Sequence, residues 1–116
     1  MKKIALLLAI VFILSTQLSA HAAEPRMLSI YPGISFSGTT AECSLAVTGD
    51  YADDEIDVVI KLWRGSTCLR TWYASGEGYV FWEGTATVTK GKTYKLTVDV
   101  TVNDVTKPRV STSGTC

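Results

Sequence analysis

The side chains best suited to recognise a ligand are aromatic and lie close together in the sequence. Six of the ten aromatic residues in residues 23–116 fall between residues 63 and 82. Aromatic rings on a sheet face stack on sugar rings or anchor a protein partner. Alternation places Trp63 on the outer face of its predicted strand, where an aromatic ring has no core to fill. The candidate contact residues are Trp63, Trp72, Tyr73 and Phe81.

A structural interpretation of the same residues stays open. In it Trp72 and Trp82 are ordinary core residues, and Trp63 is a cross-strand partner on the outer face. The domain has one Asn and no Gln, so a glycan site would depend on acids, Arg, Ser or backbone for polar contacts.

The chain offers little of the chemistry that enzymes use. Its one histidine, His21, lies in a segment that we expect to be removed, which takes away the commonest general base and zinc ligand. Residues 23–116 contain no Ser-x-x-Lys or Gly-x-Ser-x-Gly pattern. Two separated carboxylates could serve a glycosidase, but the acids lie in one predicted loop and on solvent-facing strand positions. We expect no enzymatic activity and no cofactor.

A run of acidic residues follows residue 49. It is either a solvated loop or, as the alternative, a calcium-binding loop. Calcium prefers clustered carboxylate and carbonyl oxygens. The spacing differs from the twelve-residue calcium loop, and acidic runs are usually solvated connections. We expect no metal, and the calcium candidates in the alternative are Asp50, Asp53, Asp54 and Glu55.

Three cysteines, Cys43, Cys68 and Cys116, predict one disulfide and one remaining thiol. A disulfide in a small secreted domain contributes about 2–4 kcal/mol. If the topology is immunoglobulin-like, the second strand starts and the last strand ends at the same pole, which favours Cys43 with Cys116. Pairings of Cys68 with either of the others stay open.

The N-terminus has the regions of a secretory signal peptide. Lys2 and Lys3 precede the apolar residues 4–14, and small residues lead to Ala22. That apolar run is shorter than the roughly 20 residues of a membrane anchor. We expect a cleaved signal peptide, residues 1–22, and one secreted domain, residues 23–116, without stable membrane insertion. Nine basic and eleven acidic residues then remain, a net charge of −2 that argues against nucleic acid as a partner.

Residues 94–102 give the clearest structural signal. Leu96, Val98, Val100 and Val102 alternate with polar residues, the period of a strand with one buried face. The preceding residues 89–92 predict a turn at Gly91. A turn followed by Tyr94 at the start of a long strand is typical of a tyrosine corner, in which the phenol bonds upstream backbone.

The remaining segments predict short strands about ten residues apart. They are a first strand over residues 26–37 broken at Pro32-Gly33, then residues 41–48, 56–63, 68–73 and 79–88. The breaks are a hairpin loop at 64–67, a second loop at 74–78 and a bulge at Gly84. The pattern predicts an all-β, antiparallel, two-sheet immunoglobulin-like (fibronectin-III-like) sandwich of seven or eight strands.

The sequence also predicts which residues pair across the last hairpin. A two-residue turn at Asn103-Asp104 would place Lys107 and Arg109 on the core face. A three-residue loop over residues 103–105 instead pairs Val98 with Val110 and sets Asp99 opposite Arg109, so we expect that loop. Pro108 marks the final strand as an edge.

Four segments carry a likeness to a known family: 41–47, 56–62, 69–72 and 88–98. They resemble a family of short secreted proteins of Gram-positive bacteria that has no assigned activity. The resemblance covers nearly all of the domain and implies an extracytoplasmic protein of unknown function with no catalytic residues. Cys68 and Cys116 depart from the pattern of that family.

We expect a secreted, non-enzymatic binding or surface-interaction protein whose partner is an unknown protein or a cell-surface glycan. The alternative function is a carbohydrate-binding module that uses exposed aromatics on cell-wall or other polysaccharides. A dimer linked by a disulfide or by an edge strand also stays open.

Overall fold

Eight antiparallel strands make up residues 27–116, the part of the chain that the computed structural model describes. The predicted signal peptide lies outside these residues. The strands are β1 (Ser29–Ser37), β2 (Thr40–Thr48), β3 (Glu55–Arg64), β4 (Thr67–Glu77), β5 (Tyr79–Thr87), β6 (Thr93–Val102), β7 (Val105–Thr106) and β8 (Val110–Thr115). Within the described range, no helix is long and apolar enough to cross a membrane.

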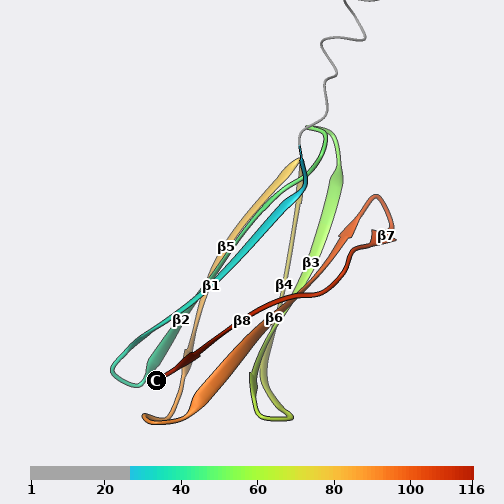
Figure 1. The fold of residues 1–116 in the computed structure, drawn as a ribbon. Helices are drawn as coiled ribbons and strands as arrows, with labels where there is room; N and C mark the ends of the chain where they lie inside the picture. Colours follow the sequence, from blue (N-terminus) through green and yellow to red (C-terminus); the bar gives the residue numbers. More distant parts are fainter. Residues whose placement is uncertain (1–26) are drawn as a thin grey trace, which may run out of the picture.

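The strands form two sheets that face each other. One sheet has the order β1-β2-β5, and the other has the order β4-β3-β6-β7 with β8 also paired to β6. Figure 1 shows the three-stranded sheet on the left of the view, with β3, β4 and β6 of the other sheet to its right. The predicted all-β, two-sheet architecture is confirmed.

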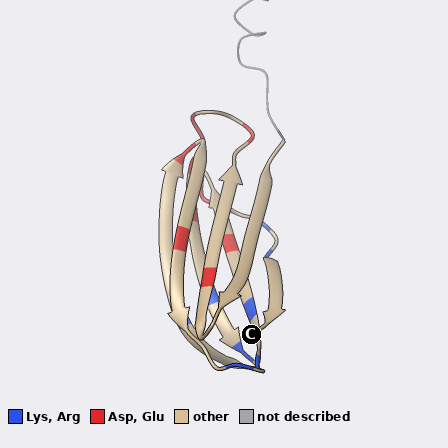
Figure 2. Cartoon of the chain, turned by 90° about the vertical axis from the view of Figure 1, so that its left-hand side faces the viewer, with Lys and Arg blue, Asp and Glu red and all other residues tan. Residues whose placement is uncertain are grey.

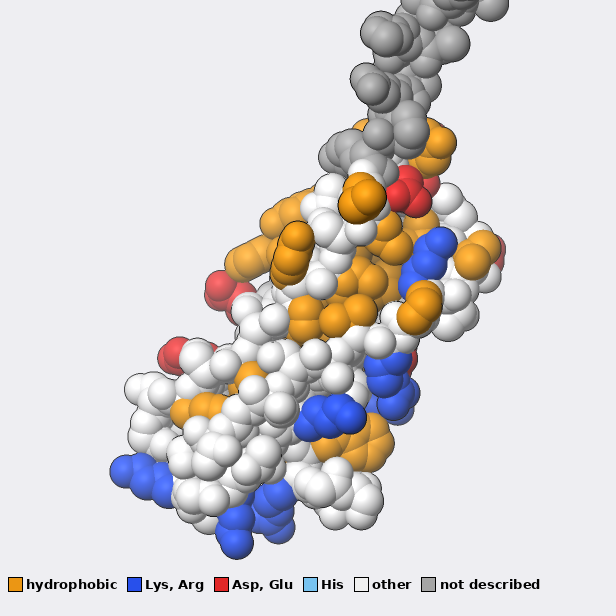
Figure 3. Space-filling model, viewed as in Figure 1, with side chains coloured by type: hydrophobic (Ala, Val, Ile, Leu, Met, Phe, Trp, Pro, Cys, Tyr) orange, Lys and Arg blue, Asp and Glu red, His pale blue; other side chains and the backbone are white. Residues whose placement is uncertain are grey.

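Alternating apolar residues of both sheets form the core. The inner residues of β2, β3 and β6 are each at most 6% exposed, and burial of one such aliphatic side chain contributes about 1.5–3 kcal/mol. Leu28, Ile30, Ile34 and Phe36 pack against this core and are only partly buried. Hydrophobic side chains are accordingly visible on the side where β1 borders the other sheet (Figure 3).

Between β4 and β5 the chain passes from one sheet to the other through a single residue, Gly78. Its N–H donates to the carbonyl of Asp54 at 2.7 Å, and its carbonyl accepts from the N–H of Gly49 at 2.9 Å. Its φ of 72° favours glycine, and a Cβ at this position would collide with the carbonyl of Ala52. Residues 74–77, which we expected in a loop, therefore continue β4, because the break is confined to Gly78.

Two other predicted interruptions are absent. β1 pairs with β2 through Pro32 and Gly33 without a break, because β1 is an edge strand and the missing N–H of proline removes no bond. The predicted bulge at Gly84 is also wrong, since β2 and β5 pair continuously through it. Gly84 instead leaves room for the indole of Trp82, which a Cβ would strike.

The last hairpin combines both registers that the sequence allowed. Asn103 and Asp104 have φ of 49° and 66° and form the two-residue turn that we rejected, with Val102 opposite Val105. Residues 107–109 are irregular, although the N–H of Lys107 still donates to the carbonyl of Val100 at 2.8 Å. Regular pairing resumes with the register shifted by one residue, so that Val98 lies opposite Val110, as predicted. This shift keeps Lys107 and Arg109 out of the core. Arg109 forms a salt bridge with Asp99 at 2.9 Å on the outer face.

The expected tyrosine bond is present. The backbone N–H of Thr89 donates to Oη of Tyr94 at 2.8 Å, and the Tyr94 side chain is 1% exposed. The bond fixes the turn before β6 to the start of the strand that carries the centre of the core.

We predict that Tyr94→Phe lowers the free energy of unfolding by about 1–2 kcal/mol, because it removes this acceptor and leaves the ring in place. Urea unfolding followed by tryptophan fluorescence measures the change. Tyr51→Phe on an exposed loop is the matched control and should change stability little. Equal stability of Tyr94→Phe and the parent protein would show that the bond is dispensable.

Candidate functional site

The side chain of Trp63, the first candidate from the sequence, makes its contacts within its own sheet. It lies half-buried on the outer face of β3, as predicted, and its indole N–H donates to Oγ1 of Thr97 on β6 at 2.9 Å. Thr97 is an outer-face residue that is only 2% exposed. Nζ of Lys61 lies 5.9 Å from the Trp63 ring centroid. Trp63 therefore acts as a cross-strand partner, whatever further contact it makes.

The four candidate contact residues lie on three different surfaces. Trp72 of β4 contacts Trp82 of β5, with ring centroids 4.9 Å apart, and both pack against the core. This pair covers the side of the sandwich where the edges of the two sheets meet. Tyr73 is 76% exposed on the outer face of the five-stranded sheet, opposite Val59. Phe81 is 59% exposed on the outer face of the three-stranded sheet.

The outer face of the β1-β2-β5 sheet gathers three exposed aromatics. In the ladder Tyr31 pairs with Ala46, and Ala46 pairs with Phe81, so that the two rings flank a small residue about 10 Å apart across the sheet. Tyr79 lies in the adjacent row beside Thr48. Tyr31 is 70% exposed and Tyr79 is 52% exposed. We call the two cross-strand rows that carry Tyr31, Phe81 and Tyr79 the aromatic rows.

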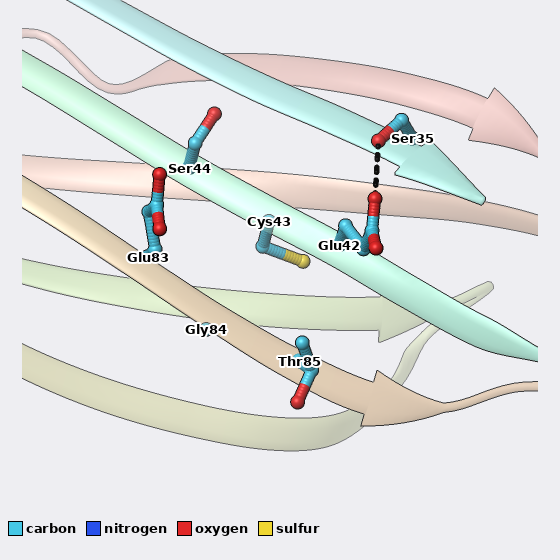
Figure 4. Close-up of a pocket in the computed structure, with 7 residues that line it drawn as sticks. All are labelled: Ser35, Glu42, Cys43, Ser44, Glu83, Gly84 and Thr85. Carbon is cyan, nitrogen blue, oxygen red and sulfur yellow. Dashed lines mark hydrogen bonds between the residues drawn. The ribbon is translucent and has the colours of Figure 1, made fainter. Parts of the chain in front are cut away.

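A hollow of about 590 Å³ adjoins the aromatic rows on the same face. Glu42 and Ser44 of β2, Glu83 and Thr85 of β5 and Ser35 of β1 contribute its polar side chains. Cys43 and Gly84 complete the lining. Figure 4 shows Glu83 beside Ser44, and Glu42 joined to Ser35, whose hydroxyl lies 3.5 Å from Oε2 of Glu42. Gly33, opposite Ser44, has no side chain to fill this part of the face.

The two ends of the sandwich differ in charge. Figure 2 views the molecule from the side of the three-stranded sheet and shows basic residues gathered at the lower end and acidic residues in the upper loop. The strands β1, β2 and β5 contain no Lys or Arg, and their only charged residues are Glu42 and Glu83. The face can therefore offer ring faces, hydroxyls and carboxylate oxygens to a ligand.

The acidic loop does not assemble a calcium site. Oδ1 of Asp50 accepts from the backbone N–H of Leu28 at 2.7 Å. The carboxylate of Asp54 accepts from the N–H of Tyr51 and from Nδ2 of Asn103, each at 3.0 Å. Asp53 and Glu55 are exposed. Among residues 27–116, no group of three or more His, Cys, Asp or Glu side chains could hold a metal ion.

All three cysteines are free thiols, so the expected disulfide is not formed. Cys43 is buried in the middle of β2, whereas Cys68 is exposed on β4, where its thiol contacts the carbonyl of Arg70 at 3.5 Å. Sγ of Cys116 donates to the carbonyl of Gly38 at 3.3 Å. The favoured pairing of Cys43 with Cys116 assumed a cysteine near the start of β2, but Cys43 lies well inside the strand.

Sequence reasoning missed Tyr31 and Tyr79 as surface partners of Phe81. Tyr31 is an even number of positions from Ser29 and Ser35, so it lies on the same outer face of the strand as these polar residues. The sequence does not state that β1 and β5 both flank β2, which is what brings these rings onto one surface.

No protein-family model matches the chain, and no similar protein was found among curated proteins. The resemblance to short secreted bacterial proteins thus stays a prediction.

Burial raises the pKa of the Cys43 thiol to about 11 from a usual value of 9.0. Between these values the folded protein keeps a proton that the unfolded chain loses, so stability falls as pH rises. From pH 8 to 11 we predict that the free energy of unfolding drops by about 2 kcal/mol more in the parent protein than in Cys43→Ala. Urea titrations across this range measure it, and parallel pH dependences would contradict the assignment.

Proposed function

We propose that this protein is an extracytoplasmic, non-enzymatic module that binds polysaccharide through the outer face of the β1-β2-β5 sheet. The observation that carries the proposal is the row of Tyr31, Ala46 and Phe81, which sets two exposed rings on either side of a small residue. Sugar rings present C–H faces that pack on aromatic rings, and their hydroxyls require polar partners nearby.

The polar partners lie next to the rings. Glu83 is two residues from Phe81 along β5, and Ser44 is opposite Glu83 on β2. Side chains two residues apart on a strand share a face and are about 7 Å apart. A chain of two or three sugars could therefore lie along the strands, with one ring on the aromatic rows and the next over the hollow.

The size of the face favours a polymer chain over a second copy of the protein. Three strands of nine residues cover roughly 14 by 30 Å, or about 420 Å², against about 800 Å² on each partner of a standard interface. A single polysaccharide chain needs a strip no wider than this.

The fold we propose is immunoglobulin-like and of the fibronectin-III kind. In the constant-type immunoglobulin domain the fourth strand joins the sheet of the first two. Here β4 pairs with β3 in the other sheet, and the Tyr94 bond to Thr89 corresponds to a tyrosine corner. Sandwiches of this kind commonly occur in extracellular binding domains, which agrees with the signal peptide predicted at residues 1–22.

We predict that the purified protein is retained on at least one of insoluble peptidoglycan, chitin and cellulose, and that Phe81→Ala weakens retention about tenfold. A loss of about 1.4 kcal/mol, the size expected for one aromatic contact, gives that factor. Depletion of protein from the supernatant at increasing polymer concentration measures the affinity.

Tyr73→Ala is the matched control, because Tyr73 is also an exposed aromatic residue but lies on the outer face of the opposite sheet. It should bind as the parent protein does. If Tyr73→Ala loses binding and Phe81→Ala keeps it, the ligand face is on the other sheet. If no polymer retains the parent protein, the polysaccharide proposal fails for these ligands.

A further inference from the structure

The hollow beside the aromatic rows contains two carboxylates without a basic neighbour on their sheet. Glu42 and Glu83 are both exposed, and β1, β2 and β5 contain no Lys or Arg. Within residues 27–116 the salt bridge that the structure forms joins Arg109 and Asp99 on the other sheet. No basic side chain of this sheet therefore offsets the negative charge of the hollow.

The ladder fixes how these two charges are spaced. Ser44 pairs with Glu83 and Glu42 pairs with Thr85, so the glutamates are diagonal neighbours on adjacent strands. Diagonal neighbours have Cβ atoms about 7–8 Å apart. The groups between and beside them, Ser35, Ser44 and Thr85, are hydroxyls that accept or donate hydrogen bonds but add no charge.

Both chemical features of the face favour a cation. Carboxylates form charge-assisted hydrogen bonds with ammonium groups, and the faces of Phe81 and Tyr31 attract cations through their ring quadrupoles. The two carboxylates would repel a polyanion from this face, since β1, β2 and β5 contain no Lys or Arg.

We propose that the polysaccharide bound by this face carries free amino groups, and that Glu42 and Glu83 select them over acetylated ones. This inference rests on the proposed function: the aromatic rows bind the sugar rings, and the carboxylates of the hollow bind the charged amino groups on those rings. An N-acetyl group has no positive charge, so an acetylated polymer would keep the stacking contacts and lose the ionic ones.

Chitosan and chitin provide the test, because they share a backbone and differ in acetylation. At low salt and pH 6 the purified protein should bind chitosan about tenfold more tightly than chitin, as expected for two exposed charge pairs of up to about 0.7 kcal/mol each. The preference should shrink at high salt. The double variant Glu42→Gln, Glu83→Gln should bind both polymers equally, at the level of the parent protein on chitin.

The double variant Glu55→Gln, Glu77→Gln, a pair of exposed residues opposite each other on β3 and β4, removes the same two charges and is the matched control, which should keep the preference. Equal loss in this control would mean that the overall charge, and not the hollow, attracts chitosan, which overturns the inference. A double variant that still prefers chitosan overturns it as well.

The two proposals fail in distinguishable ways. Binding to chitin that depends on Phe81, without a preference for chitosan, leaves the polysaccharide function standing and removes the amino-group inference. Binding to neither polymer overturns the amino-group inference, and the polysaccharide function then stands only if peptidoglycan or cellulose retains the protein. Displacement of the protein from chitosan by poly-lysine more readily than by soluble chitosan oligomers would point to a cationic polypeptide and overturn the assignment to a glycan.

Discussion

A sandwich this small can bury only one face of each sheet, and the rest of the structure depends on that constraint. The inner residues of β2, β3 and β6 form the contact between the sheets, and each of them is nearly inaccessible to solvent. Because side chains alternate along a strand, burying these residues forces their neighbours outward. The outer faces are therefore available for recognition, and their composition is free to differ. One face is mixed in charge and carries Trp63 and Tyr73, and the other is aromatic and acidic.

Hydrogen bonds join the loops at the acidic pole to each other and to the crossing between the sheets. Asp54 links the loop before β3 to Asn103 of the last hairpin, and its carbonyl accepts from the N–H of Gly78, where the chain changes sheet. Asp54 is only 4% exposed, and its carboxylate accepts hydrogen bonds from Tyr51 and Asn103. The acidic residues that suggested calcium in the sequence thus have a structural role in two cases, Asp50 and Asp54.

Local patterns predicted the strands, their buried faces and the Tyr94 bond, because each depends on residues close together in the chain. The register of Val98 with Val110 was also predictable, since only that pairing keeps the core apolar. The turn at Asn103 was not, because the irregular residues 107–109 that accommodate it have no sequence signature. The candidate site was hardest to predict: Phe81 was identified, but Tyr31 and the hollow depend on β1 and β5 flanking β2, a pairing between distant segments.

The most direct test of the central claim is to map the ligand onto the protein by backbone amide shifts in NMR during titration with soluble chitosan oligomers. The account predicts that the shifts concentrate on the outer face of β1, β2 and β5, around Tyr31, Ala46, Phe81 and Glu83. Shifts centred on Trp63 and Tyr73, or an absence of shifts at saturating ligand, would contradict it.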